Sequence, residues 1–110
     1  MSRYPADFLH GTLDTLILKT LTGGPMHGYA IAKRIRDWSG GDLEIEDGSL
    51  YPALNRMLVK GWLKAEWGMT DNNRKARFYQ LTAEGKKQLE KEATGFDKMI
   101  RAIQLVMKTS

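Results

Sequence analysis

An apolar stripe near the end of the chain limits the folds that this sequence can adopt more than any other feature. Its members step by 4, 3, 4, 3 and 4 residues: Leu89, Ala93, Phe96, Ile100, Ile103 and Met107. This spacing predicts a helix of about three heptads whose apolar side needs a partner. That partner is either the rest of the same chain or a second copy. We favour a homodimer with these six residues at its interface, because the preceding segments already form a closed unit.

Three shorter helical patterns come before the stripe. Apolar residues recur at helical spacing over 8–21 and 29–38, and a third pattern runs from about 47 to 60. Glycine-rich stops at 23–25, 39–41 and Gly61 end them. If Ser49 is the N-cap of the third helix, Pro52 occupies its third position, where proline is tolerated.

Alternating residues predict strands. The four residues 43–46 alternate and suit a short strand, while 62–67 and 76–81 alternate around a turn-rich connector and predict a β-hairpin. Thr82 then suits the N-cap of the last helix, with Glu84 in its first turn.

The order helix, helix, helix, hairpin, long helix predicts a mainly α fold with a small β-hairpin. It is the layout of a winged helix-turn-helix followed by a long C-terminal dimerisation helix. Residues 1–81 would form the DNA-binding domain with its N-terminal helix. Residues 82–110 would form the dimerisation helix, and the two parts would make one compact unit.

The third helix carries polar side chains away from its apolar positions, in the stretch GSLYPALNRMLVKGWL (48–63). Asn and Arg have donors suited to base edges, and Ser and Tyr can reach phosphates. The candidate DNA-binding residues here are Ser49, Tyr51, Pro52, Asn55 and Arg56. The alternative is an ordinary solvated helix face.

The hairpin connector is the sharpest local excess of positive charge. Arg74, Lys75 and Arg77 place three cations within four residues, and they complete the candidate DNA-binding set, because such a tip can contact a phosphate backbone or a minor groove. An ordinary polar hairpin tip remains the alternative.

Composition narrows the remaining classes. Seventeen Lys and Arg against thirteen Asp and Glu give a net charge of +4, which permits a nucleic-acid partner. With no cysteine and only two histidines, His10 and His27, we expect no metal site. No nucleophile elbow or phosphate loop is present, so we expect neither a cofactor nor an enzyme. The absence of a signal peptide and of a long apolar run favours a cytoplasmic protein with no membrane partner.

Four stretches together resemble the PadR-type transcriptional regulators, in the compact subgroup that ends in one helix. They are LDTLILKTL (13–21), GPMHGYAIAKRI (24–35), EDGSLYPALNRMLVKGWLKAEWG (46–68) and RKARFYQLTAEGKKQL (74–89). The resemblance implies dimeric winged-helix proteins, usually repressors, that bind inverted repeats in promoters. It also implies that some members release DNA when a small aromatic or hydrophobic compound binds. Phe96 falls where relatives often have tryptophan, so Phe96 and Ile100 mark the candidate effector pocket.

We therefore expect a sequence-specific, dimeric repressor of double-stranded DNA. The alternative from another class is a winged-helix module that binds proteins without specific DNA binding.

Overall fold

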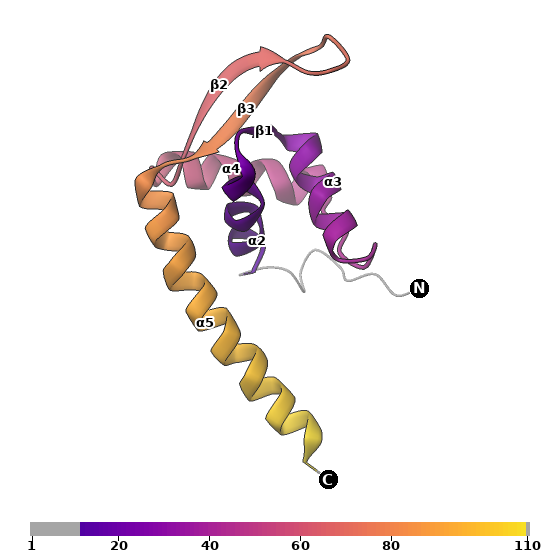
Figure 1. The fold of residues 1–110 in the computed structure, drawn as a ribbon, viewed down its shortest axis with the longest axis vertical. Helices are drawn as coiled ribbons and strands as arrows, with labels where there is room; N and C mark the ends of the chain where they lie inside the picture. The colour runs from indigo at the N-terminus through magenta and orange to yellow at the C-terminus, as the bar shows by residue number, and fades with distance from the viewer. Residues whose placement is uncertain (1–11, 110) are drawn as a thin grey trace.

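The computed structural model describes residues 12–109 and has the expected mainly helical architecture with a small antiparallel sheet. The elements are α2 (Leu13–Thr20), the 3₁₀ helix η1 (Leu21–Gly23), β1 (Met26–His27), α3 (Gly28–Trp38), α4 (Asp47–Val59), β2 (Leu63–Met69), β3 (Lys75–Leu81) and α5 (Ala83–Lys108). Figure 1 shows α2, α3 and α4 gathered beneath the β2–β3 hairpin, with α5 extending away from them. The winged helix with a C-terminal helix is confirmed. No helix within 12–109 is both long and apolar enough to cross a bilayer.

The core lies where α2, α3 and α4 meet the base of the hairpin. Each helix contributes the apolar side that its spacing predicted. The fully buried large side chains of this core come from all three helices: Ile17, Leu18, Ile31, Leu50, Leu54 and Met57. Leu63, Tyr79 and Leu81 close it from the sheet.

The sheet has the strand order β1-β3-β2, and both pairings are antiparallel. Leu63 pairs with Leu81 at the base of the hairpin, and Met69 pairs with Lys75 next to its tip. The hairpin was predicted, but β1 was not, because two residues are too short to show alternation. β1 joins the hairpin to the start of α3, since Met26 pairs with Tyr79.

The predicted strand at 43–46 is wrong. These residues form an irregular segment between α3 and α4, and within 12–109 the sheet contains only β1, β2 and β3. The alternation has another cause. Ile45 is buried in the core and Leu43 packs against it, while Glu46 is exposed.

The predicted N-cap of the third helix is also wrong. α4 begins at Asp47 with Glu46 as its N-cap, because the N–H groups of Ser49 and Leu50 both donate to the Glu46 carbonyl at 2.9 Å. Ser49 is therefore inside the first turn and Pro52 lies within the helix. A proline there cannot donate to the carbonyl four residues earlier, which belongs to the exposed Gly48.

Three elements meet where α5 begins. Gly61 ends α4 with a φ of 78°, in the left-handed region. The Thr82 hydroxyl donates to the Gly61 carbonyl at 2.6 Å and accepts the Gly85 N–H at 3.0 Å, so the predicted cap of α5 is confirmed. A Cβ at the buried Gly85 would collide with the Trp62 carbonyl.

The first predicted helix is observed in part. α2 begins at Leu13, and the predicted helical residues 8–11, including His10, lie outside the described residues.

Candidate nucleic-acid interface

An open groove of about 1020 Å³ separates the start of α3 and Tyr51 of α4 from the β2–β3 hairpin, called here the wing (residues 63–81). Its lining joins aromatic, polar and cationic side chains from all three elements: His27, Gly28, Tyr29, Ala30, Lys33, Tyr51, Trp67, Thr70, Asp71, Asn72, Arg74, Lys75, Ala76, Arg77 and Tyr79. Four of these residues are Lys or Arg and one is Asp. The groove therefore favours an anionic occupant.

The α3 side of the groove is held by His27. Its Nδ1 accepts the Ala30 N–H at 3.4 Å and so caps the start of α3. The His27 ring also stacks on Tyr29 and meets the edge of Phe78 from the wing. These contacts fix the first turn of α3 against the sheet. Tyr29 itself stays 70% exposed and faces the groove.

The α4 side is Tyr51. Its hydroxyl end lies against Gly28, where no side chain intervenes between α3 and α4. Burial raises the pKa of the Tyr51 phenol, and the nearby Asp47 and Tyr79 raise it further. The side chain is 41% exposed, so one edge remains open to the groove.

The wing side is cationic and aromatic. Trp67 pairs across the hairpin with Arg77, and both lie on the side that is buried at the base and exposed toward the tip. Lys75 Nζ lies 5.3 Å from the Trp67 ring centre and Arg77 Cζ lies 5.9 Å from the Tyr79 ring centre. These cations rest on aromatic faces while their charges stay solvated, which suits contact with a phosphate chain.

A short turn forms the tip of the wing. The Asn73 N–H donates to the Thr70 carbonyl at 2.9 Å, and the Arg74 N–H donates to the Thr70 hydroxyl at 3.1 Å. Asn73 has a φ of 62°, a conformation that asparagine accepts more readily than most residues. The turn therefore gives a reason for asparagine at position 73, and it leaves Arg74 exposed at the tip of the wing.

The predicted DNA-binding residues do not all lie together. Tyr51, Arg74, Lys75 and Arg77 line the groove. Pro52 and Asn55 are exposed on α4 outside its lining, and Ser49 is half-buried.

Arg56 differs from the other four predicted residues of α4. Its Nη2 is 2.8 Å from Oδ1 of Asp14 on α2, so its guanidinium already has an internal anionic partner.

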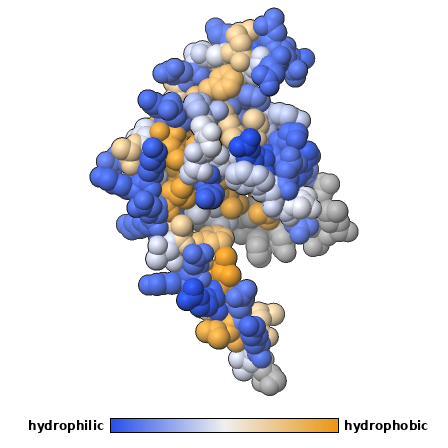
Figure 2. All heavy atoms as spheres, in the orientation of Figure 1, coloured by the Kyte–Doolittle hydropathy of each residue, from blue (hydrophilic) through white to orange (hydrophobic). Residues whose placement is uncertain are grey.

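The six predicted interface residues on α5 become more exposed toward the C-terminal end of the helix. Leu89 packs against the core, and Ala93 and Phe96 are half-buried. Ile100, Ile103 and Met107 are exposed, as are Met99 and Val106 beside them. Figure 2 shows orange, apolar atoms along the part of α5 that extends below the rest of the molecule. Such a band has no partner within the described chain.

The sequence matches the model of the Transcriptional regulator PadR-like family over residues 17–91. The chain belongs to the PadR-like family of transcriptional regulators. A solved transcriptional regulator from Clostridium thermocellum is 28% identical, with a TM-score of 0.83 over 93% of this chain and 99% of that one. A PadR family transcriptional regulator from Eggerthella lenta is 27% identical, with a TM-score of 0.77 over 94% and 88%. An uncharacterised protein from Lysinibacillus sphaericus is 25% identical over 94% of each chain.

The family resemblance expected from the sequence is thus confirmed, and this family consists of transcriptional regulators rather than enzymes. The groove nevertheless includes residues that sequence reasoning missed, among them Tyr29, Lys33 and Trp67. A signal was present for Tyr29 and Trp67. An exposed tyrosine at the start of a helix and a tryptophan near the tip of a strand both leave large apolar surface in water unless something covers it.

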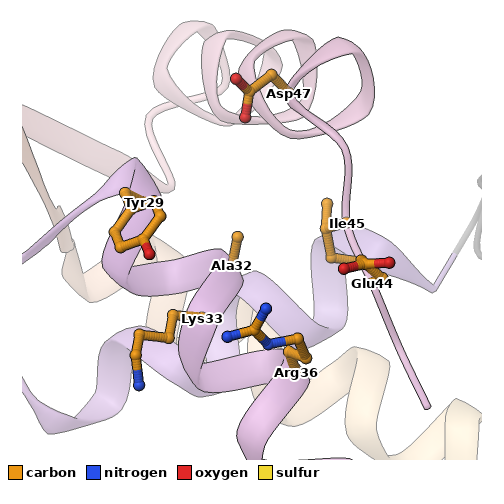
Figure 3. A pocket seen from close by; sticks show the side chains of 7 residues that line it. All are labelled: Tyr29, Ala32, Lys33, Arg36, Glu44, Ile45 and Asp47. Carbon is orange, nitrogen blue, oxygen red and sulfur yellow. The ribbon is translucent and has the colours of Figure 1, made fainter. Parts of the chain in front are cut away.

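A second, smaller cavity of about 150 Å³ lies between α3 and the segment that leads into the first residue of α4 (Figure 3). Lys33 and Arg36 of α3 and Glu44 and Asp47 opposite them give it both charges. Because two cations face two anions, this cavity favours neither an anionic nor a cationic ligand. Within 12–109, no three His, Asp or Glu side chains are arranged to hold a metal ion.

Proposed function

We propose that this PadR-family protein is a homodimeric repressor that binds an inverted-repeat promoter site through α4 and the wing. The observation that carries the proposal is the groove, in which Tyr51 of α4 faces Arg74, Lys75 and Arg77 of the wing. A regulator that places a helix in the major groove needs cations beside it for the flanking phosphates. The arrangement supplies both from adjacent elements.

In this proposal α4 reads the bases. Asn55 is exposed four residues after Tyr51, so both lie on the open side of the helix. The Asn55 amide can pair with an adenine edge in the major groove of DNA. The DNA backbone and the walls of its major groove are contacted by Tyr51, Ser49 and Pro52. Arg56 belongs to the same surface, but a DNA contact by Arg56 would replace its ion pair with Asp14.

The wing holds the phosphate backbone. Arg74, Lys75 and Arg77 neutralise phosphates, and each contact lowers the log–log slope of affinity against salt by about 0.9. The aromatic surfaces of Trp67 and Tyr29 form the remaining walls of the groove and pack against the sugars.

Dimer formation through α5 would cover its exposed apolar band and present two copies of α4. Two such helices one turn of DNA apart, about 34 Å, suit an inverted repeat. Three of the six predicted interface residues support this arrangement, because they have no cover in one chain: Ile100, Ile103 and Met107. Leu89 packs on its own core, and Ala93 and Phe96 are half-buried.

An effector would act between the two copies. Phe96 is half-buried and Ile100 is 40% exposed one turn later, so together they offer an apolar surface beside the dimer seam. A small aromatic or hydrophobic compound bound there would release DNA by altering the pairing of the two α5 helices. Displacement of operator DNA by such a compound, lost in Phe96→Ala, would test this step.

The principal test is binding of the purified protein to DNA from upstream of its own gene, at two salt concentrations and with unrelated DNA as competitor. We expect a specific complex that weakens steeply with salt. Arg74→Ala should weaken all sequences alike, whereas Asn55→Ala should relax the choice of one base pair. Lys108→Ala, at the far end of α5, is the charge-matched control for Arg74→Ala. Unchanged affinity and sequence preference in Asn55→Ala would refute the role of α4.

Sedimentation tests the dimer. Ile100→Asp should give monomer or unfolded chain, because burying an unpaired carboxylate costs several kcal/mol, comparable with the stability of a small domain. Leu105→Asp is the matched control, since Leu105 is 66% exposed on α5 but lies off the seam. A stable Ile100→Asp dimer would exclude the seam.

A further inference from the structure

The carboxylate of Glu92 joins α5 to α2. Its Oε2 accepts the Thr15 hydroxyl of α2 at 2.8 Å. Its Oε1 accepts the side-chain amide of Gln88, one turn earlier on α5, at 3.0 Å. The two oxygens are therefore used in different directions, one toward the body of the protein and one along α5. Because a charged acceptor makes the stronger hydrogen bonds, this pair holds the carboxylate in a single orientation.

The position of Glu92 along α5 gives this contact its importance. The buried Gly85 and the half-buried Leu89 fix the first two turns against the wing and the core. From residue 97 to residue 109 every residue is exposed. Glu92 thus lies near the end of the attached part, and the last twelve residues of α5, 97–108, extend about 18 Å beyond the body at 1.5 Å per residue.

The exposed seam residues Ile100, Ile103 and Met107 all lie on this extended part. A small rotation of α5 about its attached end would therefore move them by a large distance relative to α4. Thr15 belongs to the helix that packs on α4 through the core and through the Asp14–Arg56 ion pair. The Glu92–Thr15 bond consequently links the angle of α5 to the element that carries α4.

We propose that Glu92 is a positioning residue for DNA binding: its bond to Thr15 fixes the angle between α5 and the body, and so fixes the separation of the two α4 helices in the dimer. This inference rests on the proposed dimeric, DNA-binding function. In this proposal Glu92 acts through its contacts within its own chain, to Thr15 and Gln88, and not by touching DNA. Its effect is on the spacing between half-sites that the protein accepts, and not on the base contacts within one half-site.

A distance measurement tests the angle without DNA. The chain has no cysteine, so Lys19→Cys on α2 and Arg101→Cys on α5 accept spin labels at two chosen sites only. Double electron–electron resonance then measures the distance between the two labels. Labelled chains are mixed with an excess of unlabelled chains, so that only the distance between labels of the same chain contributes. We expect one narrow distribution in the otherwise unchanged protein, and a broader distribution with a shifted mean in Glu92→Ala and in Thr15→Val.

Two variants serve as references. Glu92→Gln keeps a carbonyl oxygen that can accept from Thr15, so it should restore the narrow distribution. Thr94→Val is the control for Thr15→Val, because the Thr94 hydroxyl donates only within α5, to the Glu90 carbonyl at 3.1 Å. An unchanged distribution in folded Glu92→Ala and Thr15→Val would overturn the inference.

Operators whose half-site spacing varies in single base pairs give the functional readout. The unmodified protein should prefer one spacing, and Glu92→Ala and Thr15→Val should lose that preference while binding an isolated half-site as before. Retained preference in both variants would overturn the inference. If the unmodified protein binds no operator specifically, the proposed function fails instead, and the distance measurement alone decides whether Glu92 fixes the angle.

Discussion

The phenol of Tyr51 occupies the space in which a side chain at Gly28 would stand. An ideal Cβ on Gly28 would lie 2.7 Å from the Tyr51 hydroxyl oxygen and 2.9 Å from its Cε1 and Cζ atoms. The first turn of α3 therefore approaches α4 only because residue 28 has no side chain. This contact also holds Tyr51 at the edge of the groove that faces the wing.

Gly28→Ala should reduce the free energy of unfolding by about 1 kcal/mol, the low end of the usual cost of overpacking, because the clashing atoms are the partly exposed end of the Tyr51 ring. The added methyl group must displace the Tyr51 ring or separate α3 from α4. Chemical denaturation measures the loss. Gly48→Ala is the matched control, since nothing lies within 4 Å of its ideal Cβ, and it should gain up to about 1 kcal/mol from helix propensity. Equal denaturation midpoints for Gly28→Ala and the unmodified protein would contradict the prediction, because they would show that the space between Gly28 and Tyr51 admits a methyl group.

Burial of Tyr51 also predicts a pH dependence. Because burial, Asp47 and Tyr79 raise its pKa in the folded protein, folding favours the neutral phenol. The associated stability is fully present below the ordinary tyrosine pKa of about 10 and is lost as the pH rises through the raised value. Free energies of unfolding between about pH 9 and 12 should therefore fall more steeply for the unmodified protein than for Tyr51→Phe, with the difference developing above about pH 10. Tyr29→Phe, at a mostly exposed ring, should keep the steeper fall; the same slope in all three proteins would refute the prediction.

The ion pair between Asp14 and Arg56 predicts an effect on DNA affinity. Asp14→Asn removes the charge that holds the Arg56 guanidinium on α2, so Arg56 becomes available to phosphates. We expect tighter binding to operator and unrelated DNA alike, with a salt slope steeper by about 0.9 for one added contact. The cost in stability should be small, about 0–1 kcal/mol, because Arg56 is half-exposed.

The double variant Asp14→Asn with Arg56→Ala is the control, and it should lose the gain in affinity. Weaker binding by Asp14→Asn alone would mean that the ion pair holds α4 in its DNA-binding position.

Gly95 lies inside α5 with nothing within 4 Å of its ideal Cβ. In the single chain it has no packing reason to be glycine, and glycine costs a helix about 1 kcal/mol relative to alanine. Gly95→Ala should therefore raise the midpoint of thermal unfolding, measured at constant protein concentration. A weaker dimer in sedimentation, despite an intact fold, would contradict this and would place the partner helix against Gly95.

The helices and the wing were predictable because their apolar spacing and their stops agree. Thr82 and Gly61 followed from capping chemistry alone. The two failures differ in cause. At 43–46 the alternation suited a strand, but burial of Ile45 in the distant core accompanies an irregular segment, and a local pattern does not contain such a contact. At Ser49 the hydroxyl suited an N-cap, but the helix begins earlier, where the Glu46 carbonyl accepts two N–H groups.

The candidate site was partly predictable. The cations of the wing and the polar residues of α4 were visible as composition, and Tyr51, Arg74, Lys75 and Arg77 do share one groove. The pairing of Arg56 with Asp14 spans 42 residues, and that of Glu92 with Thr15 spans 77. No sequence pattern identifies partners at such separations, so the internal role of each side chain appears only in the fold.

The contacts around Thr82 make the base of the wing less tolerant of inserted residues than its tip. Its hydroxyl holds Gly61 at the end of α4, its N–H donates to the Trp62 carbonyl at 3.1 Å, and Gly85 packs on that same carbonyl. One inserted residue between 61 and 63 or between 81 and 85 would rotate the base of the wing, the end of α4 and the axis of α5 together. The turn at 70–74 is held by bonds within itself, since the Asn73 and Arg74 N–H groups both donate to Thr70. A residue inserted at the tip of the wing should therefore be tolerated, whereas one inserted at its root should lower the free energy of unfolding.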